Sequence, residues 1–100
     1  MKRTIENLRN NLEGKVYVWF ETDDVAKRFM EDADAEGYLI GGKRPIEVKT
    51  PQDFMAIEKD KQISHLSTSG HAAIGANADN VRIVDYAKYV NGEKDYFWRK

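Results

Sequence analysis

The clearest hydrophobic pattern in the chain is the run KVYVWFE at residues 15–21. Successive side chains of a strand point to opposite faces of a sheet, so alternate residues of the run share a face. One face would carry Val16, Val18 and Phe20, and the other Tyr17 and Trp19. Both faces are apolar and β-prone, which is typical of a strand that is covered on both sides.

A helical pattern follows directly, and we predict the main helix of the protein over residues 22–36. Thr22 can cap its N-terminus, and Gly37 is suited to end it. Apolar residues recur there at helical spacing, at Val25, Phe29 and Ala33. A shorter apolar stripe predicts a helix over residues 4–12, which must be stabilised by packing because it is short.

The rest of the chain predicts mainly strands and turns. Residues 38–40 form a second strand. The strand-helix-strand order favours a parallel neighbour of the first strand through a right-handed crossover, although the helix is short enough for other arrangements. Residues 46–49 continue in extended form, and Thr50 to Asp53 form a turn. Two short apolar runs around a charged turn indicate a hairpin of residues 54–57 and 63–66. A last strand covers 81–86, and 87–90 extend it.

The stretch LSTSGHAAIGAN, residues 66–77, combines hydroxyls, a histidine and two glycines. A Walker-type phosphate loop would end in Gly-Lys-Ser/Thr, and the lysine is missing here. A serine nucleophile beside His71 or His65 would need a third group and a sharp elbow, and no Gly-x-Ser-x-Gly motif is present. We interpret the stretch as a helix that is capped by Ser67, Thr68 or Ser69 and leads into the last strand.

These elements predict one α+β domain over residues 1–100. It has a sheet of about four or five strands, packed with one main helix and one or two short helices. The length of 100 residues and the 41% of hydrophobic residues suit a single small core. Residues 93–100 form a charged tail that is either flexible or packed on the sheet through its aromatic residues.

Composition excludes several classes of protein. The chain has no cysteine, which excludes a disulfide framework, a thiolate zinc site and a cysteine nucleophile. The N-terminal residues lack the apolar stretch of a signal peptide, and the longest apolar run, residues 16–20, is far too short to span a membrane. We expect a soluble, cytoplasmic protein without a cofactor or a metal site, since the two histidines are a weak pointer to a metal.

Charge makes nucleic acid an unlikely direct partner, because the net charge is −1. The charges are nevertheless uneven, with an acidic segment at residues 21–37. Its exposed face could meet a basic partner surface. The predicted partner-binding residues are Asp23, Asp24, Asp32 and Glu36, together with the tail aromatics Tyr96 and Trp98. Self-association through the tail is an open alternative.

A second candidate site is the loop Gly41, Gly42, Lys43 and Arg44. Two glycines free the backbone to turn its amides toward an anion, and the two bases add positive charge. The alternative is an ordinary surface turn that exposes its lysine and arginine. The loop would serve a nucleotide- or anion-binding module.

A set of short matches resembles small proteins carried by phages and integrated elements of Gram-positive gut bacteria. The matches are Gly14-Lys-Val-Tyr-Val18, a helix that opens Thr22-Asp-Asp-x-Ala-Lys-x-Phe29, Gly37 before an aromatic residue, and Val84-Asp-Tyr86. They extend over residues 12 to 90, although Tyr38 stands where the set often has tryptophan. The resemblance implies a genomic setting more than a mechanism. Compact proteins of this kind often work by binding, including inhibitors of host defence such as anti-CRISPR proteins, so we expect a non-catalytic binding protein that acts on a host protein. It carries over no catalytic residue.

Overall fold

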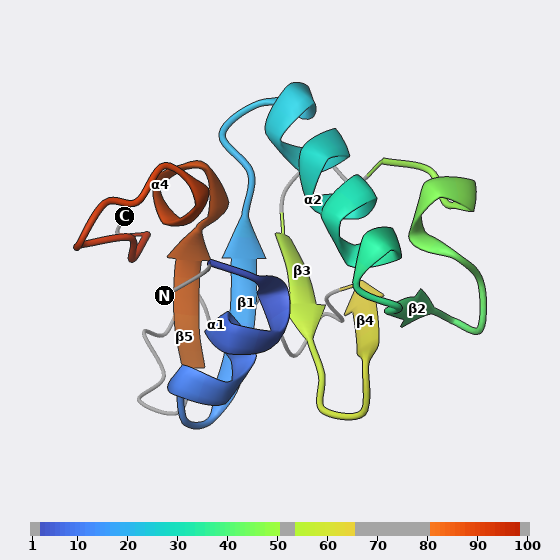
Figure 1. Cartoon of the computed structure of the whole chain (residues 1–100), viewed down its shortest axis with the longest axis horizontal. Helices are drawn as coiled ribbons and strands as arrows, with labels where there is room; N and C mark the ends of the chain where they lie inside the picture. Colours follow the sequence, from blue (N-terminus) through green and yellow to red (C-terminus); the bar gives the residue numbers. More distant parts are fainter. Residues whose placement is uncertain (1–2, 51–53, 66–80, 99–100) are drawn as a thin grey trace.

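The computed structural model describes residues 3–50, 54–65 and 81–98. The predicted helix within residues 66–77 and most of the predicted turn at residues 50–53 lie outside these ranges. In the described part, five strands form one mixed sheet and helices pack on it, which confirms the predicted α+β fold (Figure 1).

The sheet has the strand order β2-β4-β3-β1-β5. Strand β1, Lys15–Trp19, lies between β3, Phe54–Ile57, which is antiparallel to it, and β5, Val81–Asp85, which is parallel. Strand β4, Gln62–His65, closes the predicted hairpin with β3, and β2, Leu39–Ile40, pairs with β4 in parallel. The central strand is thus the one that the sequence pattern makes apolar on both faces.

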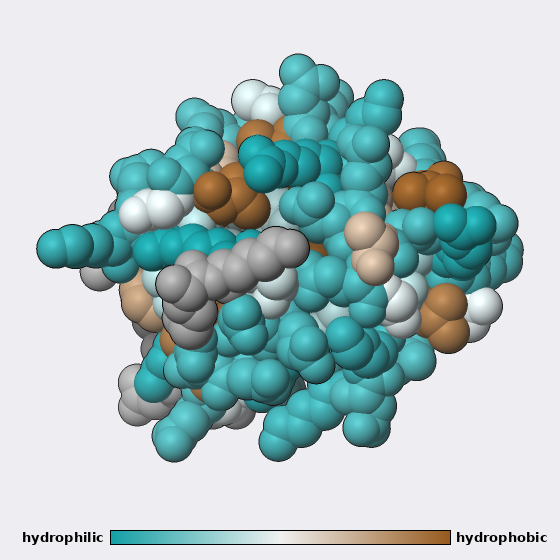
Figure 2. Space-filling model, viewed as in Figure 1, coloured by the Kyte–Doolittle hydropathy of each residue, from teal (hydrophilic) through white to brown (hydrophobic). Residues whose placement is uncertain are grey.

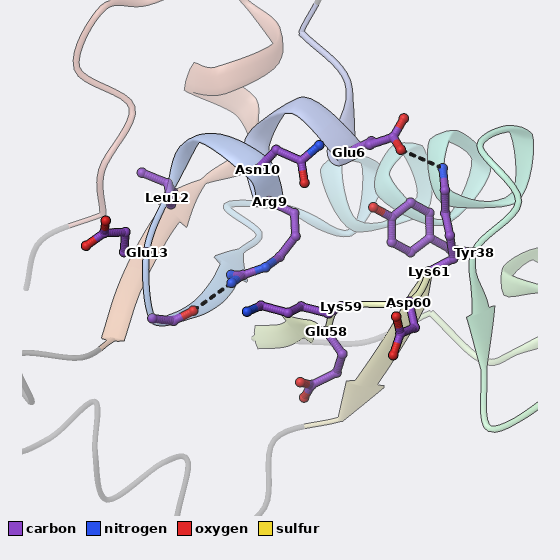
Figure 3. Close-up of a pocket in the computed structure, with 11 residues that line it drawn as sticks. Glu6, Arg9, Asn10, Leu12, Glu13, Tyr38, Glu58, Lys59, Asp60 and Lys61 are labelled. Atoms are coloured by element: carbon purple, nitrogen blue, oxygen red, sulfur yellow. Dashed lines mark hydrogen bonds and ion pairs between the residues drawn. The ribbon is translucent and has the colours of Figure 1, made fainter.

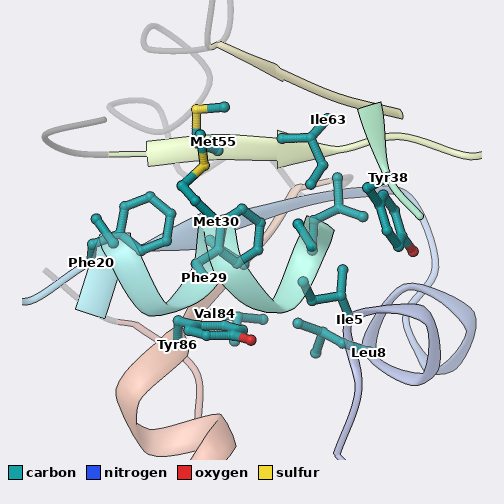
Figure 4. Packing of buried hydrophobic residues seen from close by; sticks show 14 of the residues in the cluster. Ile5, Leu8, Phe20, Phe29, Met30, Tyr38, Met55, Ile63, Val84 and Tyr86 are labelled. Carbon is teal, nitrogen blue, oxygen red and sulfur yellow. The ribbon is translucent and has the colours of Figure 1, made fainter. Parts of the chain in front are cut away.

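Within the described residues, three α-helices pack against one face of this sheet (Figures 1 and 4). They are α1, Ile5–Asn11; α2, Asp23–Ala35; and α4, Tyr86–Val90. Helix α2 buries the predicted stripe around Phe29, which contacts Phe20 and Tyr86 at ring-centroid distances of 5.1 and 5.0 Å. Helix α1 adds Ile5 and Leu8, both fully buried, so the short helix is held by packing as predicted.

Both predicted helix caps are present. The Thr22 Oγ1 accepts a hydrogen bond from the Val25 N–H at 3.3 Å, and the Thr4 Oγ1 accepts one from the Asn7 N–H at 3.0 Å. Each cap satisfies a first-turn N–H that has no partner within its helix. The boundaries of α1 and α2 therefore follow from local sequence.

The opposite face of the sheet carries a smaller apolar cluster. Tyr17 and Ala56 are buried at its centre, and Phe54, Ile83 and Trp98 are among the partly buried residues around them. Trp98 comes from the tail, whose backbone pairs with β5 through the Trp98 N–H and the Ile83 oxygen at 2.9 Å. The alternative in which the tail packs on the sheet therefore holds through Trp98.

The prediction that residues 38–40 lie beside the first strand is wrong. Strand β2 runs parallel to β1, but the β3–β4 hairpin lies between them. The hairpin strand β3 offers four residues in register with β1, whereas β2 has only two residues to pair. The longer antiparallel partner therefore takes the place next to β1.

Two further local predictions are wrong. Residues 87–90 do not extend the last strand, because the Asp85 carboxylate accepts a hydrogen bond from the Lys88 N–H and starts helix α4. The predicted extended segment 46–49 begins instead with a 3-10 turn, η1, Pro45–Glu47. Proline fixes φ in the helical range and is favoured at the first position of a helix, which explains this turn.

Candidate functional site

Glu36, at the C-terminal end of α2, uses its carboxylate in hydrogen bonds within the protein. Its Oε2 accepts a hydrogen bond from the Ile5 N–H at 2.9 Å, and its Oε1 accepts one from the Glu6 N–H at 3.0 Å. The carboxylate therefore binds the positive end of α1 and, with Thr4, satisfies the N–H groups of its first three residues. A predicted partner-binding residue is thus the cap of a second helix.

Asp32, one turn earlier, is committed in a similar way. The Tyr86 hydroxyl donates a hydrogen bond to its Oδ2 at 2.6 Å, and the Arg28 Nε lies 3.7 Å from the same oxygen. Tyr86 is almost fully buried. Burial, and secondly this hydrogen bond, raise the pKa of Tyr86 well above its usual range.

A shallow hollow of about 520 Å3 lies over these two carboxylates. It is bordered by the start of α1, the last turns of α2 and the end of α4, and Arg3 and Arg28 also line it. The Arg3 Nη1 donates a hydrogen bond to the backbone carbonyl oxygen of Tyr89 at 3.0 Å, so Arg3 too has an internal partner. The charged groups of the hollow all have partners within the protein, which leaves little free charge for a ligand.

Asp23 and Asp24 differ from these residues because both are exposed on the first turn of α2. Within the described part of the chain neither side chain has a hydrogen-bond or ion-pair partner. Their position favours the helix through its dipole but leaves both carboxylates available to another molecule. The face of the molecule that carries the helices is predominantly hydrophilic (Figure 2).

The two tail aromatics join different parts of the molecule. Tyr96 packs edge-to-face on Tyr89 at 5.1 Å, and the Arg3 guanidinium lies 5.1 Å from its ring centroid. Trp98 lies on the other side of the sheet, 5.7 Å from Trp19 and 5.3 Å from Phe54 between ring centroids. Only Trp98 therefore belongs to a surface aromatic cluster, which we define as Trp19, Phe54 and Trp98.

The sequence interpretation missed Trp19 and Phe54 as members of a candidate site, because both fit equally well into a buried strand. A signal was nevertheless present. The chain has only two tryptophans, and Trp19 shares a strand face with Tyr17, opposite the face of Val16 and Val18. Both tryptophans lie in the aromatic cluster and are only partly buried.

The loop at Gly41 and Gly42 is a tight turn. Both glycines have positive φ, +57° and +80°, as a two-residue hairpin turn requires. The Ile40 N–H bonds the Lys43 oxygen at 2.9 Å and the Lys43 N–H bonds the Ile40 oxygen at 3.0 Å. The glycines thus have a conformational reason for their presence that does not involve a ligand.

Arg44 of this loop is paired within the protein. Its Nε and Nη2 donate to the two carboxylate oxygens of Asp34 at 3.0 and 2.8 Å. This hydrogen-bonded pair lowers the pKa of Asp34 and raises that of Arg44. The anion-binding interpretation of the loop is therefore left with Lys43, which is exposed.

Catalytic and metal chemistry gain no support from the described residues. His65 is exposed at the end of β4, while His71 and the three hydroxyl residues at 67–69 lie outside the described ranges. No group of three or more histidine, aspartate or glutamate side chains in those ranges is placed to hold a metal ion. Nor does any helix in those ranges have the length and apolar character needed to cross a membrane.

Comparisons with known proteins add no relative. No protein-family model matches the chain, and no curated protein or solved structure matches it either.

Proposed function

We propose that this protein acts by binding another protein and catalyses no reaction. The observation that carries the proposal is the pairing of a partly exposed aromatic cluster with unpaired carboxylates at one end of the sheet. Tryptophan is enriched among the residues that dominate binding energy at protein interfaces, and charged residues commonly form the surrounding rim. The expected partner surface is basic, with an apolar centre.

The chain itself keeps these two features close together. Trp19 is the last residue of β1 and Asp23 is the first of α2. Four residues of extended chain span at most about 14 Å between their Cα atoms. The aromatic cluster and α2 lie on opposite faces of the sheet. A standard interface covers about 800 Å2 on each partner, a patch roughly 30 Å across, so a partner that covers this end of the sheet can contact both.

The resemblance to small phage and integrated-element proteins supports a bacterial host protein as the partner. Inhibition of a host defence system, as by anti-CRISPR proteins, is the form of action that we infer from it. A compact domain with two exposed, unpaired carboxylates at the start of α2 in the described part of the chain suits such a role. The cytoplasm is then the compartment in which both partners would meet.

Charge reversal tests the acidic part of the surface. The wild-type protein, the Asp23→Lys/Asp24→Lys variant and a Glu47→Lys/Glu93→Lys control are immobilised and exposed to a lysate of a Gram-positive bacterium. The control changes the net charge equally at exposed positions elsewhere on the molecule. A specific partner should bind the wild type and the control, and the Asp23/Asp24 variant should lose at least about tenfold in affinity.

Tryptophan fluorescence tests the aromatic part with the purified partner. Because both tryptophans of the chain lie in the aromatic cluster, burial by a partner without tryptophan should shift their emission to shorter wavelength. The proposal fails if no protein is enriched over the bare resin. It also fails if the enriched protein binds the charge-reversed variant equally well and leaves the emission unchanged.

A further inference from the structure

A second cavity, of about 580 Å3, lies on another part of the surface (Figure 3). It is bordered by the C-terminal half of α1, the turn at Gly14, the ring of Tyr38 and the β3–β4 turn at residues 58–61. Its volume falls within the range of small-molecule sites. None of the residues in the aromatic cluster or at the start of α2 lines it.

Arg9 contains an unsatisfied donor in this cavity wall. Its Nη2 donates to the Gly14 oxygen at 2.8 Å, which fixes the guanidinium. Its Nη1 is buried and has no hydrogen-bond partner in the described part of the chain. Leaving a buried donor unpaired is costly, and most buried polar groups in proteins have a partner.

Lys59 brings a second positive charge to the same place. Its side chain extends from the β3–β4 turn toward the Arg9 guanidinium (Figure 3). It is exposed, and within the described residues it has no hydrogen-bond or ion-pair partner. Two cations that face each other repel, and an anion between them would pair with both.

The turn that carries Lys59 is held in a strained conformation. Asp60 and Lys61 have φ of +65° and +60°, a region that residues other than glycine rarely adopt. Lys61 holds the turn against the helices, because its Nζ donates to the backbone carbonyl oxygen of Glu36 at 3.1 Å and lies 3.7 Å from the Glu6 Oε1. Positive φ at consecutive residues is typical of tight hairpin turns, so this turn has a defined position beside the cavity.

The acidic residues of the wall restrict the ligand. The cavity is lined by three basic and four acidic side chains, so a polyanion would be repelled. Glu6 and Glu58 have internal partners in Lys61 and Ser64. Glu13 and Asp60 have none in the described part of the chain, and they remain available for a positive group on the same ligand.

We propose that this cavity binds a small zwitterion, with its carboxylate or phosphate between Arg9 and Lys59 and its ammonium group near Glu13 or Asp60. A rotation of the flexible Lys59 side chain gives the anion access to Nη1 of Arg9. This site is independent of the proposed partner surface, because the two share no residue.

Titrations followed by two-dimensional amide NMR test the proposal on the full chain. The probes are glycine and phosphoethanolamine as zwitterions, acetate and inorganic phosphate as anions alone, and ethylammonium as the cation alone. We expect saturable shifts at Gly14 and residues 58–61 with at least one zwitterion. Binding of that zwitterion should be about two- to fivefold tighter than binding of its anion alone. Glycine and phosphoethanolamine distinguish a carboxylate from a phosphate ligand.

Variants locate the site. Arg9→Gln should weaken binding about 10- to 100-fold, since a charge-assisted hydrogen bond to a buried group is lost. Lys59→Gln should weaken it about two- to fivefold, and because Lys59 is exposed this variant should fold normally. The control Lys27→Gln removes an exposed lysine of α2 and should change nothing. Absence of saturable shifts with both zwitterions, or equal binding by wild type and Lys59→Gln, overturns the proposal.

Discussion

At the C-terminal end of α2 the carboxylates of Asp32, Asp34 and Glu36 bind other elements, whereas at its N-terminal end Asp23 and Asp24 face solvent. The three carboxylates at the C-terminal end accept hydrogen bonds from Tyr86, from Arg44 and from the start of α1, respectively. Asp23 and Asp24 have no such partner in the described part of the chain. Acidic side chains on one helix therefore divide according to which elements are packed against each end.

The difference has a geometric cause. The last turns of α2 meet α1, α4 and the loop that leads to η1, and each presents N–H or O–H donors. The first turn comes three residues after β1 and, within the described residues, meets no such donor apart from its own Thr22 cap. Acidic composition predicts a charged surface, but only tertiary structure determines which charges remain free to bind a partner.

The largest effect is expected at Glu36. Glu36→Ala leaves two N–H groups of α1 without their acceptor, and it should lower the free energy of unfolding by about 2 kcal/mol. For a domain of this size that corresponds to a fall in Tm of roughly 10 °C. Glu31→Ala, at an exposed position of the same helix, is the control and should change stability by less than about 0.5 kcal/mol. Equal losses for the two variants would remove the distinction.

Tyr86→Phe tests whether the hydrogen bond from Tyr86 to Asp32 stabilises the fold. Loss of the hydroxyl bond to a carboxylate should cost about 1–2 kcal/mol in urea unfolding. A double-mutant cycle with Asp32→Ala should give a coupling energy near 1 kcal/mol, since the two groups are in direct contact. A coupling energy near zero would mean that Asp32 is as free as Asp24.

Lys61 offers a sharper test of how the C-terminal end is held. Lys61→Ala loses the hydrogen bond to the backbone carbonyl oxygen of Glu36 and keeps a positive φ. It should therefore lower the free energy of unfolding by about 1 kcal/mol. Lys61→Gly loses the same bond but relieves the backbone strain, and it should be more stable than the alanine variant by about 0.5–1 kcal/mol. A lower free energy of unfolding for Lys61→Gly than for Lys61→Ala would contradict the inferred backbone strain at Lys61.

An alkaline titration examines the packing around the same end. Burial raises the pKa of Tyr38 and of Tyr89 to about 12 in each case. The protonated rings therefore favour the folded state, and this contribution is complete below pH 10 and is lost as the pH rises toward 12. Absorbance at 295 nm should show delayed ionisation and unfolding above about pH 10. Ionisation of all five tyrosines near pH 10 without loss of structure would disagree with this packing.

Local sequence predicted much of the fold. Thr4, Thr22 and the stripe around Phe29 define two helices through short-range rules, and the apolar faces of residues 15–21 mark the central strand. Strand order was not predictable in this way, because the competition between β2 and β3 for β1 depends on pairing length across the sheet. The end of the last strand was missed for a local reason, since Asp85 acts as a helix cap.

The candidate site could be predicted only in part. Asp23, Asp24 and Trp98 remain candidates, while Asp32, Glu36 and Arg44 have internal partners that come from segments distant in sequence. The cavity at Arg9 had no sequence signal, because Lys59 reaches it from the β3–β4 turn, about fifty residues away along the chain.

The most direct test of the difference between the two ends of α2 compares urea unfolding of the Asp23→Asn/Asp24→Asn variant with that of Glu36→Ala. Both aspartates favour α2 only through the helix dipole, so the double variant should lose less than about 1 kcal/mol. Glu36→Ala should lose about 2 kcal/mol. A double variant that is destabilised as strongly as Glu36→Ala would contradict the account, because Asp23 and Asp24 would then also be holding the fold together.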